Sequence, residues 1–306
     1  MRQVLLLFID GVGLGDDDPA VNPIVAAQTP VLDALLGTKL VATSQRVKTA
    51  RALLVPTDAT LETGGLPQSA TGQTALFTGL NAARAEGRHV TAYPTKALKE
   101  LLGEHNLFRR VRDSGGTVAL ANAYTPEYFS AVEARRLRHA AITFSALATG
   151  VPLRGLEDLR LGRAVFHDLT NARLQRWGYD VPSRTPYEAG AILARLAMEH
   201  HLTVFEFFLT DLAAHGRVAV EPVTVVEMLD ELLGGVVGVA DLERLLVIVT
   251  SDHGNLEDRR VATHTRNAVP TVLIGQGREA VGAQIHTLMD ITPAIVGWVA
   301  GERVDG

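Results

Sequence analysis

Short apolar runs alternate along the chain with longer segments of helical periodicity. Four of the runs are too short for helices, and each ends at a polar residue or a glycine: "QVLLLFI" (3–9), "TVFEFFLTD" (203–211), "RLLVIVTSD" (244–252) and "VPTVLIG" (269–275). Continuous apolar runs of this length are typical of strands that are buried on both faces. The pattern therefore predicts four strands of one buried sheet.

Helical periodicity fills much of the space between these runs. Residues 186–201 and 222–238 carry it most clearly, a further amphipathic helix is expected around 95–113, and 116–123 reads as another strand. Strands that alternate with helices of this length favour a parallel sheet with helices packed on both faces. We therefore expect an α/β fold, a three-layer sandwich with a mainly parallel sheet.

The middle of the chain loses this regular alternation. Residues 125–184 contain loop-rich stretches such as "GYDVPSRTP", which is full of helix and strand breakers. We interpret this segment as an inserted cap or lid, so that 1–124 and 185–306 form the core. Several arginines of the segment offer contacts for an anionic substrate, although solvation at the surface is the commoner role for such residues. They are Arg135, Arg136, Arg138, Arg154, Arg160, Arg163 and Arg184.

Composition narrows the class of protein. The 306 residues are 47% hydrophobic and 21% charged, as in soluble globular proteins, and the net charge of -5 argues against nucleic acid as a partner. No apolar run approaches a membrane span, and the first run reads as a strand rather than a signal peptide. The chain has no cysteine, which excludes thiolate metal sites and fits a reducing cytoplasm. We expect a cytoplasmic protein whose partner is a small charged metabolite, and nothing indicates its oligomeric state.

Acidic side chains stand at or just beyond the ends of three predicted strands. Asp10, Asp211 and Asp252 each close an apolar run. In parallel sheets, ligands bind beyond the carboxyl ends of the strands, so these carboxylates are expected to meet at one edge. Because like charges repel at short range, a positive group is needed between them. The arrangement favours bound metal ions.

Histidines accompany these acids. His215 follows Asp211 by four residues, which places both on one face of a helix if a helical turn follows the strand. His253 is adjacent to Asp252, and His264 lies eleven residues later. A single histidine is more often satisfied by a backbone hydrogen bond, but the combination at three strand ends favours metal ligation. Oxygen and nitrogen ligands without sulfur suit manganese or zinc, with magnesium as a further option.

The stretch "GGLPQSATGQTALFTGLNAAR" (64–84) passes from breaking residues into a helical pattern at about Gly72. Thr74 is then expected near a helix N-terminus, where free N–H groups and the helix dipole favour an anion. A hydroxyl beside a divalent cation can act as a nucleophile. Ser69 and Thr71 compete for this role, and helix capping is the alternative for all three hydroxyls.

These motifs, taken in order, resemble those of the alkaline phosphatase superfamily. The branch most similar is that of cofactor-independent phosphoglycerate mutase and phosphopentomutase. The motifs that carry the resemblance are "DGVG" (10–13), "AQTPVLDAL" (27–35), "GLPQSATGQT" (65–74), "DLAAH" (211–215), "SDHGN" (251–255) and "HTRNAVP" (264–270).

The resemblance implies a binuclear metal site and a nucleophile that bridges the two metals. One metal would be held by Asp211, His215 and His264. The second would be held by Asp10, Asp252 and His253, with Thr74 as the bridging nucleophile. The mutase motif ends in Gly-Asn-Ser where this chain has Gly72-Gln73-Thr74. Threonine serves as nucleophile in other branches, whereas the substrate contact that asparagine makes is not carried over to Gln73.

We therefore expect a metal-dependent phosphoryl-transfer enzyme that acts on a small phosphate monoester through a phosphothreonine. A phosphatase is favoured over a phosphomutase because the expected cap is small. A non-catalytic metal-binding protein is the alternative from another class. A sulfatase is disfavoured because no C/S-x-P-x-R pattern is present. A dinucleotide-binding enzyme is disfavoured because "FIDGVGLG" lacks the third glycine at the required spacing.

Overall fold

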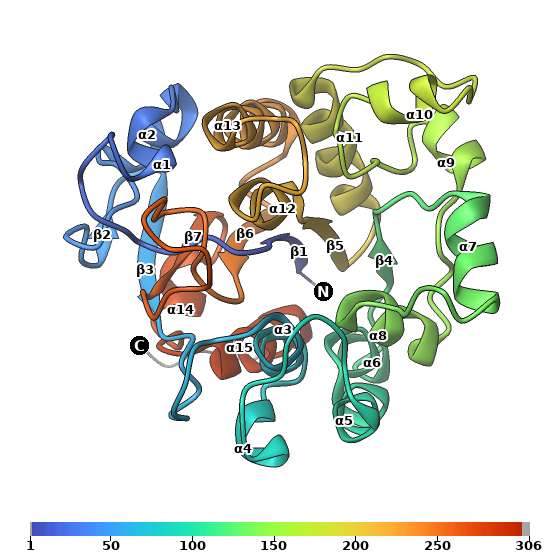
Figure 1. Cartoon of the computed structure of the whole chain (residues 1–306), viewed down its shortest axis with the longest axis horizontal. Coiled ribbons are helices and arrows are strands. Elements are labelled where there is room, and N and C mark those ends of the chain that lie inside the picture. The colour runs from blue at the N-terminus through green and yellow to red at the C-terminus, as the bar shows by residue number, and fades with distance from the viewer. Residues whose placement is uncertain (1, 302–306) are drawn as a thin grey trace.

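The computed structural model describes residues 2–301, and at its centre lies a seven-stranded sheet in the order β2-β3-β7-β6-β1-β5-β4 (Figure 1). Each of the four apolar runs becomes one of its strands. The strands are β1 (Gln3–Ile9), β2 (Val47–Lys48), β3 (Ala52–Thr57), β4 (Val118–Leu120), β5 (Leu202–Phe207), β6 (Leu245–Ser251) and β7 (Val269–Gly275).

The sheet is mixed. Strands β6, β1, β5 and β4 are parallel neighbours, whereas β7 is antiparallel to both β6 and β3, and β2 is antiparallel to β3. Parallel neighbours need a crossover connection, usually a helix. The segment 252–268 between β6 and β7 contains no helix and returns directly along the neighbouring strand. The expected α/β sandwich is confirmed. Its parallel strands are β6, β1, β5 and β4, which form the centre of the sheet and the edge at β4.

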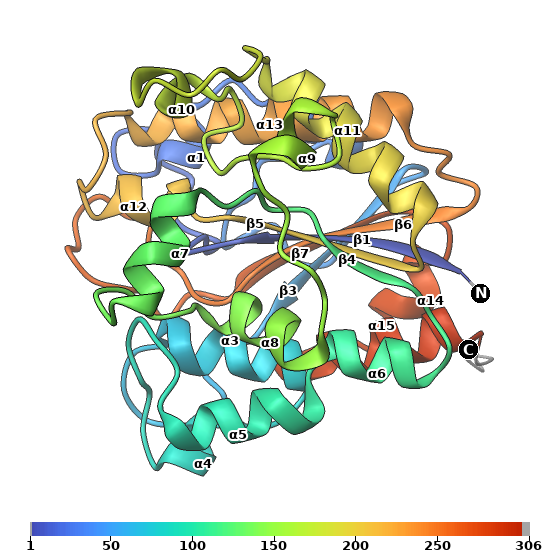
Figure 2. The same cartoon turned by 90° about the vertical axis from the view of Figure 1, so that its right-hand side faces the viewer.

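Helices cover both faces of the sheet (Figure 2). Strand β1 shows why, because Val4, Leu6 and Phe8 pack into one hydrophobic core and Leu5, Leu7 and Ile9 into the other. One face is covered by α1 (Pro23–Ala26), α2 (Pro30–Leu36), α11 (Pro186–Glu199) and α13 (Pro222–Val239). The other is covered by α3 (Ser69–Thr78), α4 (Ala82–Glu86), α5 (Lys96–His105), α6 (Leu107–Asp113), α8 (Ala141–Thr149), α14 (Arg278–Gly282), the 3-10 helix η1 (Leu288–Asp290) and α15 (Ile291–Ala300).

The helix expected around 95–113 is divided into α5 and α6 at Asn106. The Asn106 backbone is extended, its side-chain oxygen accepts a hydrogen bond from the backbone N–H of Arg109, and its amide donates to the carbonyl of Leu102. One side chain thus caps two helix ends. None of the helices within residues 2–301 has the length and apolar character of a membrane span.

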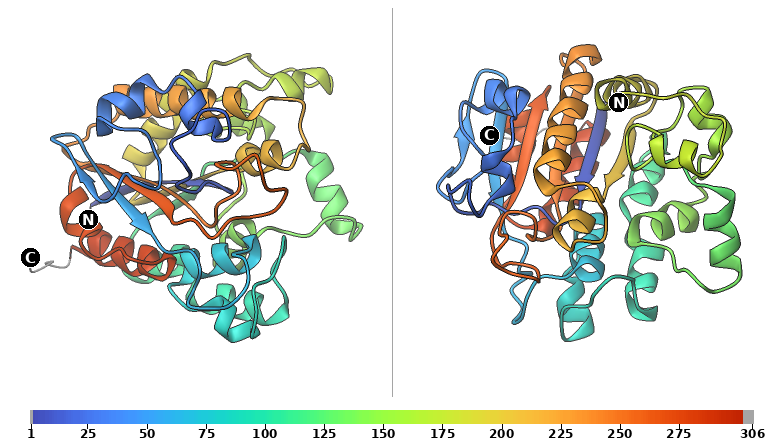
Figure 3. Two further views of the ribbon diagram at one scale, coloured as in Figure 1. Left: turned by 60° about the vertical axis from the view of Figure 1, so that its left-hand side comes forward. Right: turned by 45° about the horizontal axis from the view of Figure 1, so that its top comes forward.

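The segment 125–184 is not one continuous cap. Its helix α8 packs on the same face of the sheet as α3 and α5, and Ala141, Ile142 and Ala146 are buried in the core on that face. Helices α9 (Leu156–Arg160) and α10 (Ala172–Arg176) instead surround a small separate core around Phe166, beside the β4 edge (Figure 3, right). Helix α7 (Pro126–Glu133) buries none of its residues. The lid-like parts are therefore α7 and the α9–α10 region. Sequence missed this division because α8 is short.

The crossing of α11 and α13 depends on glycine. A Cβ atom on Gly235 would lie 1.9 Å from the carbonyl oxygen of Tyr187, whereas one on Gly103 of α5 would meet nothing within 4 Å. We expect Gly235→Ala to lower the free energy of unfolding by about 1–3 kcal/mol or more, because the helices must separate. Gly103→Ala should raise it by up to about 1 kcal/mol through helix propensity. Urea unfolding of both variants checks this, and equal effects would contradict it.

Candidate functional site

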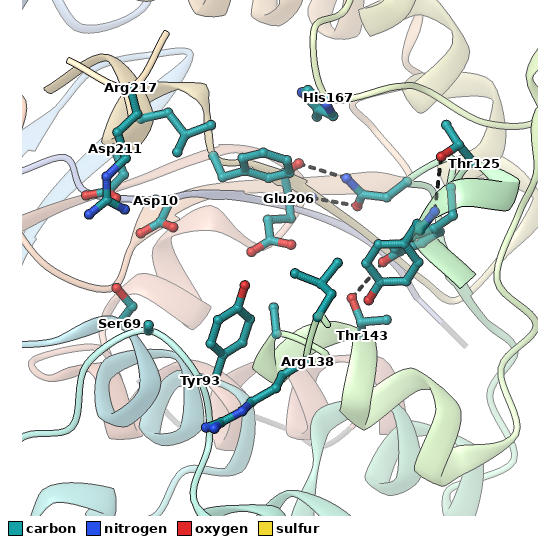
Figure 4. Close-up of a pocket in the computed structure, with 18 of the residues that line it drawn as sticks. Asp10, Ser69, Tyr93, Thr125, Arg138, Thr143, His167, Glu206, Asp211 and Arg217 are labelled. Atoms are coloured by element: carbon teal, nitrogen blue, oxygen red, sulfur yellow. Dashed lines mark hydrogen bonds between the residues drawn. The ribbon is translucent and has the colours of Figure 1, made fainter. Parts of the chain in front are cut away.

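The carboxyl ends of three adjacent parallel strands meet at one edge of the sheet. In the register of the sheet, Ile9 of β1 lies opposite Phe207 of β5 on one side and Ser251 of β6 on the other. Asp10 and Asp252 directly follow their strands. Asp211 lies instead in the first turn of α12 (Leu209–Ala214), the short helix that follows β5. Asp10 and Asp211 are consequently neighbours in Figure 4.

Asp211, His215 and His264 form the first cluster. Asp211 Oδ1 lies 3.4 Å from Nε2 of His215 and 3.9 Å from Nε2 of His264. The ring of His264 is oriented by its Nδ1–H, which donates to the carbonyl of Pro67 at 2.8 Å and leaves Nε2 facing the cluster. Burial, together with the charge of nearby His253, lowers the pKa of His264 to about 4, so this ring is neutral at pH 7.

His253 is the centre of the second cluster. Its Nε2 lies 3.4 Å from Asp10 Oδ1, 3.5 Å from Asp252 Oδ2 and 3.0 Å from Ser69 Oγ. Burial, reinforced by Asp10, raises the pKa of Asp252 well above its usual value. Burial alone would lower the pKa of His253, but the surrounding carboxylates, Asp252 foremost, outweigh it and raise this pKa to about 10.

The donor atoms fit divalent cations. The ligand atoms of Asp211, His215 and His264 lie within 4.8 Å of one another, as do those of Asp10, Asp211 and His253. Asp211 therefore borders both groups, which the sequence did not indicate. Within residues 2–301, Asp10 Oδ1 and Asp252 Oδ2 are buried without a hydrogen-bond partner, and His253 Nε2 is the nearby cationic group, at 3.4 and 3.5 Å. Buried oxygens of this kind need a positive partner, and an oxygen and nitrogen set without sulfur suits zinc, manganese or magnesium.

Thr74 does not reach this cluster. Helix α3 begins at Ser69 rather than at Gly72, so Thr74 lies in its second turn with no exposed surface. The Thr74 hydroxyl donates to the carbonyl of Ala70 at 2.6 Å. Ser69, the first residue of the helix, is the hydroxyl that faces His253. Thr71, the other competitor, donates to the carbonyl of Gln68.

Gly72 explains the difference in register. The sequence suggests a helix start at this glycine because glycine breaks helices, but here it lies inside α3. A Cβ atom at this position would lie 2.7 Å from the carbonyl oxygen of Asp252. The glycine therefore lets the helix backbone approach the loop after β6. This close approach brings Ser69 to the carboxylates.

A buried carboxylate, Glu257, ties the loops of the site together. Its Oε2 accepts hydrogen bonds from the backbone N–H groups of Gly13 and Asn255, at 2.9 and 2.8 Å. Its Oε1 accepts from the hydroxyl of Thr265 at 2.5 Å and the amide of Asn267 at 3.0 Å. The loops after β1 and β6 and the loop before β7 are thus fixed by one side chain.

Close packing around Glu257 explains two of the motif glycines. A Cβ atom on Gly13 or on Gly254 would lie 2.3 Å from Glu257 Oε1. Asn255 extends the network to the metal cluster, because its amide donates to Asp211 Oδ1 at 2.7 Å. Sequence reasoning passed over both residues, although they lie in or next to the "SDHGN" motif, because a buried carboxylate cannot be told from an exposed one without the fold.

A cavity of about 1260 Å³ opens from the clusters toward α7 and α10 (Figure 4). Asp10, Ser69 and Asp211 line it at the metal end. Glu206 of β5 lines its wall and is 7% exposed. Burial, and secondarily Asp10, raises the pKa of Glu206 to about 8. The sequence did carry a signal for this residue, because it is the one charged position inside the apolar run 203–209.

Four of the seven arginines named for the expected cap donate hydrogen bonds within the chain, namely Arg154, Arg160, Arg163 and Arg184. Arg138 lines the cavity. Arg154 donates to the carbonyls of Leu120 and Arg163, and Arg184 donates to that of Leu159. His167 lines the cavity from the segment between α9 and α10.

Comparison with known proteins finds similarity over part of the chain. The model of the metalloenzyme superfamily matches residues 164–299. A 2,3-bisphosphoglycerate-independent phosphoglycerate mutase of Moorella thermoacetica is 28% identical over 112 residues, which are 35% of this chain and 22% of the mutase. The corresponding mutase of Syntrophotalea carbinolica is 29% identical over 118 residues, 36% of this chain and 23% of that protein. This chain thus matches less than a quarter of each mutase.

Solved structures share the fold over nearly the whole chain. The PH0037 protein from Pyrococcus horikoshii has a TM-score of 0.59 and 17% identity, with 98% of this chain and 97% of that chain covered. The alkaline phosphatase of the Antarctic bacterium TAB5 has a TM-score of 0.53 and 14% identity, with 98% of each chain covered. At this level of identity the likeness concerns the fold.

Glu257 provides a test of the loop network. We expect Glu257→Gln to lower the free energy of unfolding by about 1–3 kcal/mol, because an amide N–H₂ would face hydrogen-bond donors. The affinity for Mn²⁺ or Zn²⁺ should fall about 10- to 100-fold as the ligand loops loosen. Urea unfolding and calorimetric metal titration measure the two effects. Exposed Glu243→Gln is the control, and a Glu257→Gln protein that matches it would refute the role of Glu257.

Proposed function

We propose that this chain is a member of the alkaline phosphatase superfamily, on its phosphoglycerate mutase-like branch, and that it hydrolyses a small phosphate monoester in a metal-dependent reaction. One observation carries the proposal. The hydroxyl of Ser69 lies at the N-terminus of α3, 3.0 Å from His253 and next to carboxylate oxygens that have no hydrogen-bond partner.

Two divalent cations would be held by these clusters. Asp211, His215 and His264 would hold one, and Asp10, Asp252 and His253 would hold the other beside Ser69. When bound, such cations stabilise the charge on the attacking and leaving oxygens and favour ionisation of the nucleophile. Their identity is proposed as manganese or zinc, with magnesium also compatible with the donor set.

Ser69 takes the nucleophilic role that the sequence suggested for Thr74. Its Oγ attacks the phosphorus, the bond from phosphorus to the ester oxygen breaks, and the alcohol leaves with a proton. Water then attacks the phosphoserine, which releases inorganic phosphate and restores the hydroxyl. The N-terminal turn of α3 favours the negative charge that gathers on the phosphoryl group.

The size of the cavity favours hydrolysis over intramolecular transfer. Its volume of about 1260 Å³ exceeds the roughly 300–1,000 Å³ of common ligand pockets, which leaves room for water beside a small metabolite. A mutase must keep water away from its phosphoenzyme while the substrate turns. The mutase relatives make a phosphomutase the second candidate.

The nucleophile is tested by a matched pair of variants. We expect Ser69→Ala to lower kcat for 4-nitrophenyl phosphate about a thousandfold or more and to abolish the phosphoenzyme. Thr74→Val should keep both, because its hydroxyl only bonds within α3. Mass spectrometry after acid quenching locates the phosphate. Phosphate on residue 74, or full activity of Ser69→Ala, would show that Ser69 is not the nucleophile.

Measurements of metal content and of the reaction product distinguish a phosphatase from a phosphomutase and from a non-catalytic protein. The protein reconstituted with Mn²⁺ or Zn²⁺ should bind two ions per chain by elemental analysis, and Asp252→Ala should lose at least one. Chelation should remove all activity. With 3-phosphoglycerate, ribose 1-phosphate and other sugar phosphates, we expect release of inorganic phosphate. Isomerisation without free phosphate would establish the mutase instead, and a metal-bound protein without turnover of any ester would favour the non-catalytic alternative.

A further inference from the structure

Glu206 is a buried acid that the metal clusters do not use. It lies near the end of β5, and its side chain points into the cavity between the metal end and Thr143 (Figure 4). The same cavity is lined by Asp10 and Ser69, so a phosphate ester bound at Ser69 would extend its alcohol portion into the space that Glu206 faces.

The carboxyl group of Glu206 has no partner, although its backbone is held firmly. The side chain of Asn122 brackets this backbone, because its amide donates to the carbonyl of Glu206 at 2.8 Å and its oxygen accepts from the Glu206 N–H at 2.9 Å. Within residues 2–301, no hydrogen bond or ion pair reaches the Glu206 carboxyl group. The carboxyl group faces the cavity, where it is available to form hydrogen bonds with a bound ligand.

Two more polar side chains that line this cavity lack hydrogen bonds within the described part of the chain. Gln73 lies one turn after Ser69 in α3 and is 3% exposed. His167 packs between the rings of Phe166 and Phe208, with centroids 4.1 and 4.7 Å from its own. Burial lowers the pKa of His167 to about 3, so this imidazole is neutral and can both donate and accept.

The lining of the cavity carries charges of both signs, with acids such as Glu127 and Asp211 beside arginines, and hydroxyl groups can pair with either. Arg138, Arg173 and Arg217 line the same cavity, and Arg173 lies over the ring of Trp177. An ammonium group would have to approach these guanidinium groups as well as the acids, whereas hydroxyls can pair with acids, amides and imidazole alike.

We propose that Glu206 is a specificity-determining residue that binds hydroxyl groups on the alcohol portion of the substrate, assisted by Gln73 and His167. The proposal rests on the phosphoryl-transfer function assigned to this site. It makes the cavity selective against unsubstituted alkyl phosphates, because they would leave these buried polar groups without partners.

Paired substrates test the selectivity. Each hydroxylated ester, such as glycerol phosphate or glucose 6-phosphate, is compared with the alkyl phosphate of the same carbon skeleton, using manganese-loaded enzyme. We expect wild-type kcat/KM to favour the hydroxylated member of at least one pair. Glu206→Leu should reduce that ratio about 10- to 100-fold, and Glu206→Gln, which still forms hydrogen bonds, should retain most of it. Thermal unfolding shows that the variants are folded.

The controls separate this role from others. Turnover of 4-nitrophenyl phosphate should not fall in Glu206→Leu, because this ester carries no hydroxyl groups that Glu206 could bind. Glu127→Gln should keep the wild-type ratio, because Glu127 is at the exposed rim and already accepts a hydrogen bond from Tyr179. An equal loss for both members of every pair would identify Glu206 as a proton donor to the leaving group and overturn the proposal.

A binding measurement keeps the proposal separate from catalysis. In the Ser69→Ala background, calorimetry with the same paired esters should show that Glu206→Leu weakens binding of the hydroxylated ester about 10-fold or more and does not weaken binding of the alkyl ester. If the variant shows this binding effect but the wild-type enzyme turns over none of the esters, the phosphoryl-transfer function is refuted and the hydroxyl-binding role stands. If the wild-type enzyme turns over 4-nitrophenyl phosphate but Glu206→Leu changes neither the kcat/KM ratio nor the affinity ratio of the paired esters, the hydroxyl-binding role is refuted and the phosphoryl-transfer function stands.

Discussion

The repulsion among three carboxylates at one edge of the sheet is the constraint on which the site depends. Parallel pairing of β1 with β5 and β6 brings Asp10, Asp211 and Asp252 together. Burial raises the pKa values of Asp211 and Asp252, which means that their charged forms are disfavoured without positive neighbours. His253 supplies part of that charge from the chain itself. The clusters are therefore built to gain stability when cations bind.

Because these carboxylates repel one another, the loops that carry them must be held in place. Glu257 supplies this restraint, since it accepts hydrogen bonds from the loop after β1 and from both ends of the β6–β7 connection. Glycine makes the arrangement possible, because Gly13 and Gly254 leave room for its carboxylate and Gly72 lets α3 approach Asp252. The close approaches bring Ser69 into the cluster, so its position reflects backbone packing as much as helix capping.

The cavity joins two parts of the fold with different origins. Its metal end is made by strand ends and the N-terminus of α3. Its other end is made by α7 and the α9–α10 region, which rest against the β4 edge around their own small core. Glu206 belongs to the sheet but faces the space between these parts. Recognition of a substrate is therefore expected to depend on both of them.

The sequence by itself determined the strands, most of the helices and the metal-binding motifs. Apolar runs of seven residues identify β1 and β7, because a strand that is buried on both faces reads as a continuous apolar run too short for a helix. Asp10, Asp252 and His253 were recognisable because each lies within two residues of a strand end. His215 and His264 were recognisable because they stand in motifs whose order resembles that of the alkaline phosphatase superfamily.

The tertiary structure alone decided which hydroxyl joins the metal cluster, how β7 runs and which buried acids serve the site. Gly72 looks like a helix start in sequence, yet it is a point of close approach inside α3, and this moves the candidate nucleophile from Thr74 to Ser69. The roles of Glu206 and Glu257 arise from contacts between segments distant in sequence. Local periodicity carries no information about such contacts, because they depend on how the layers pack.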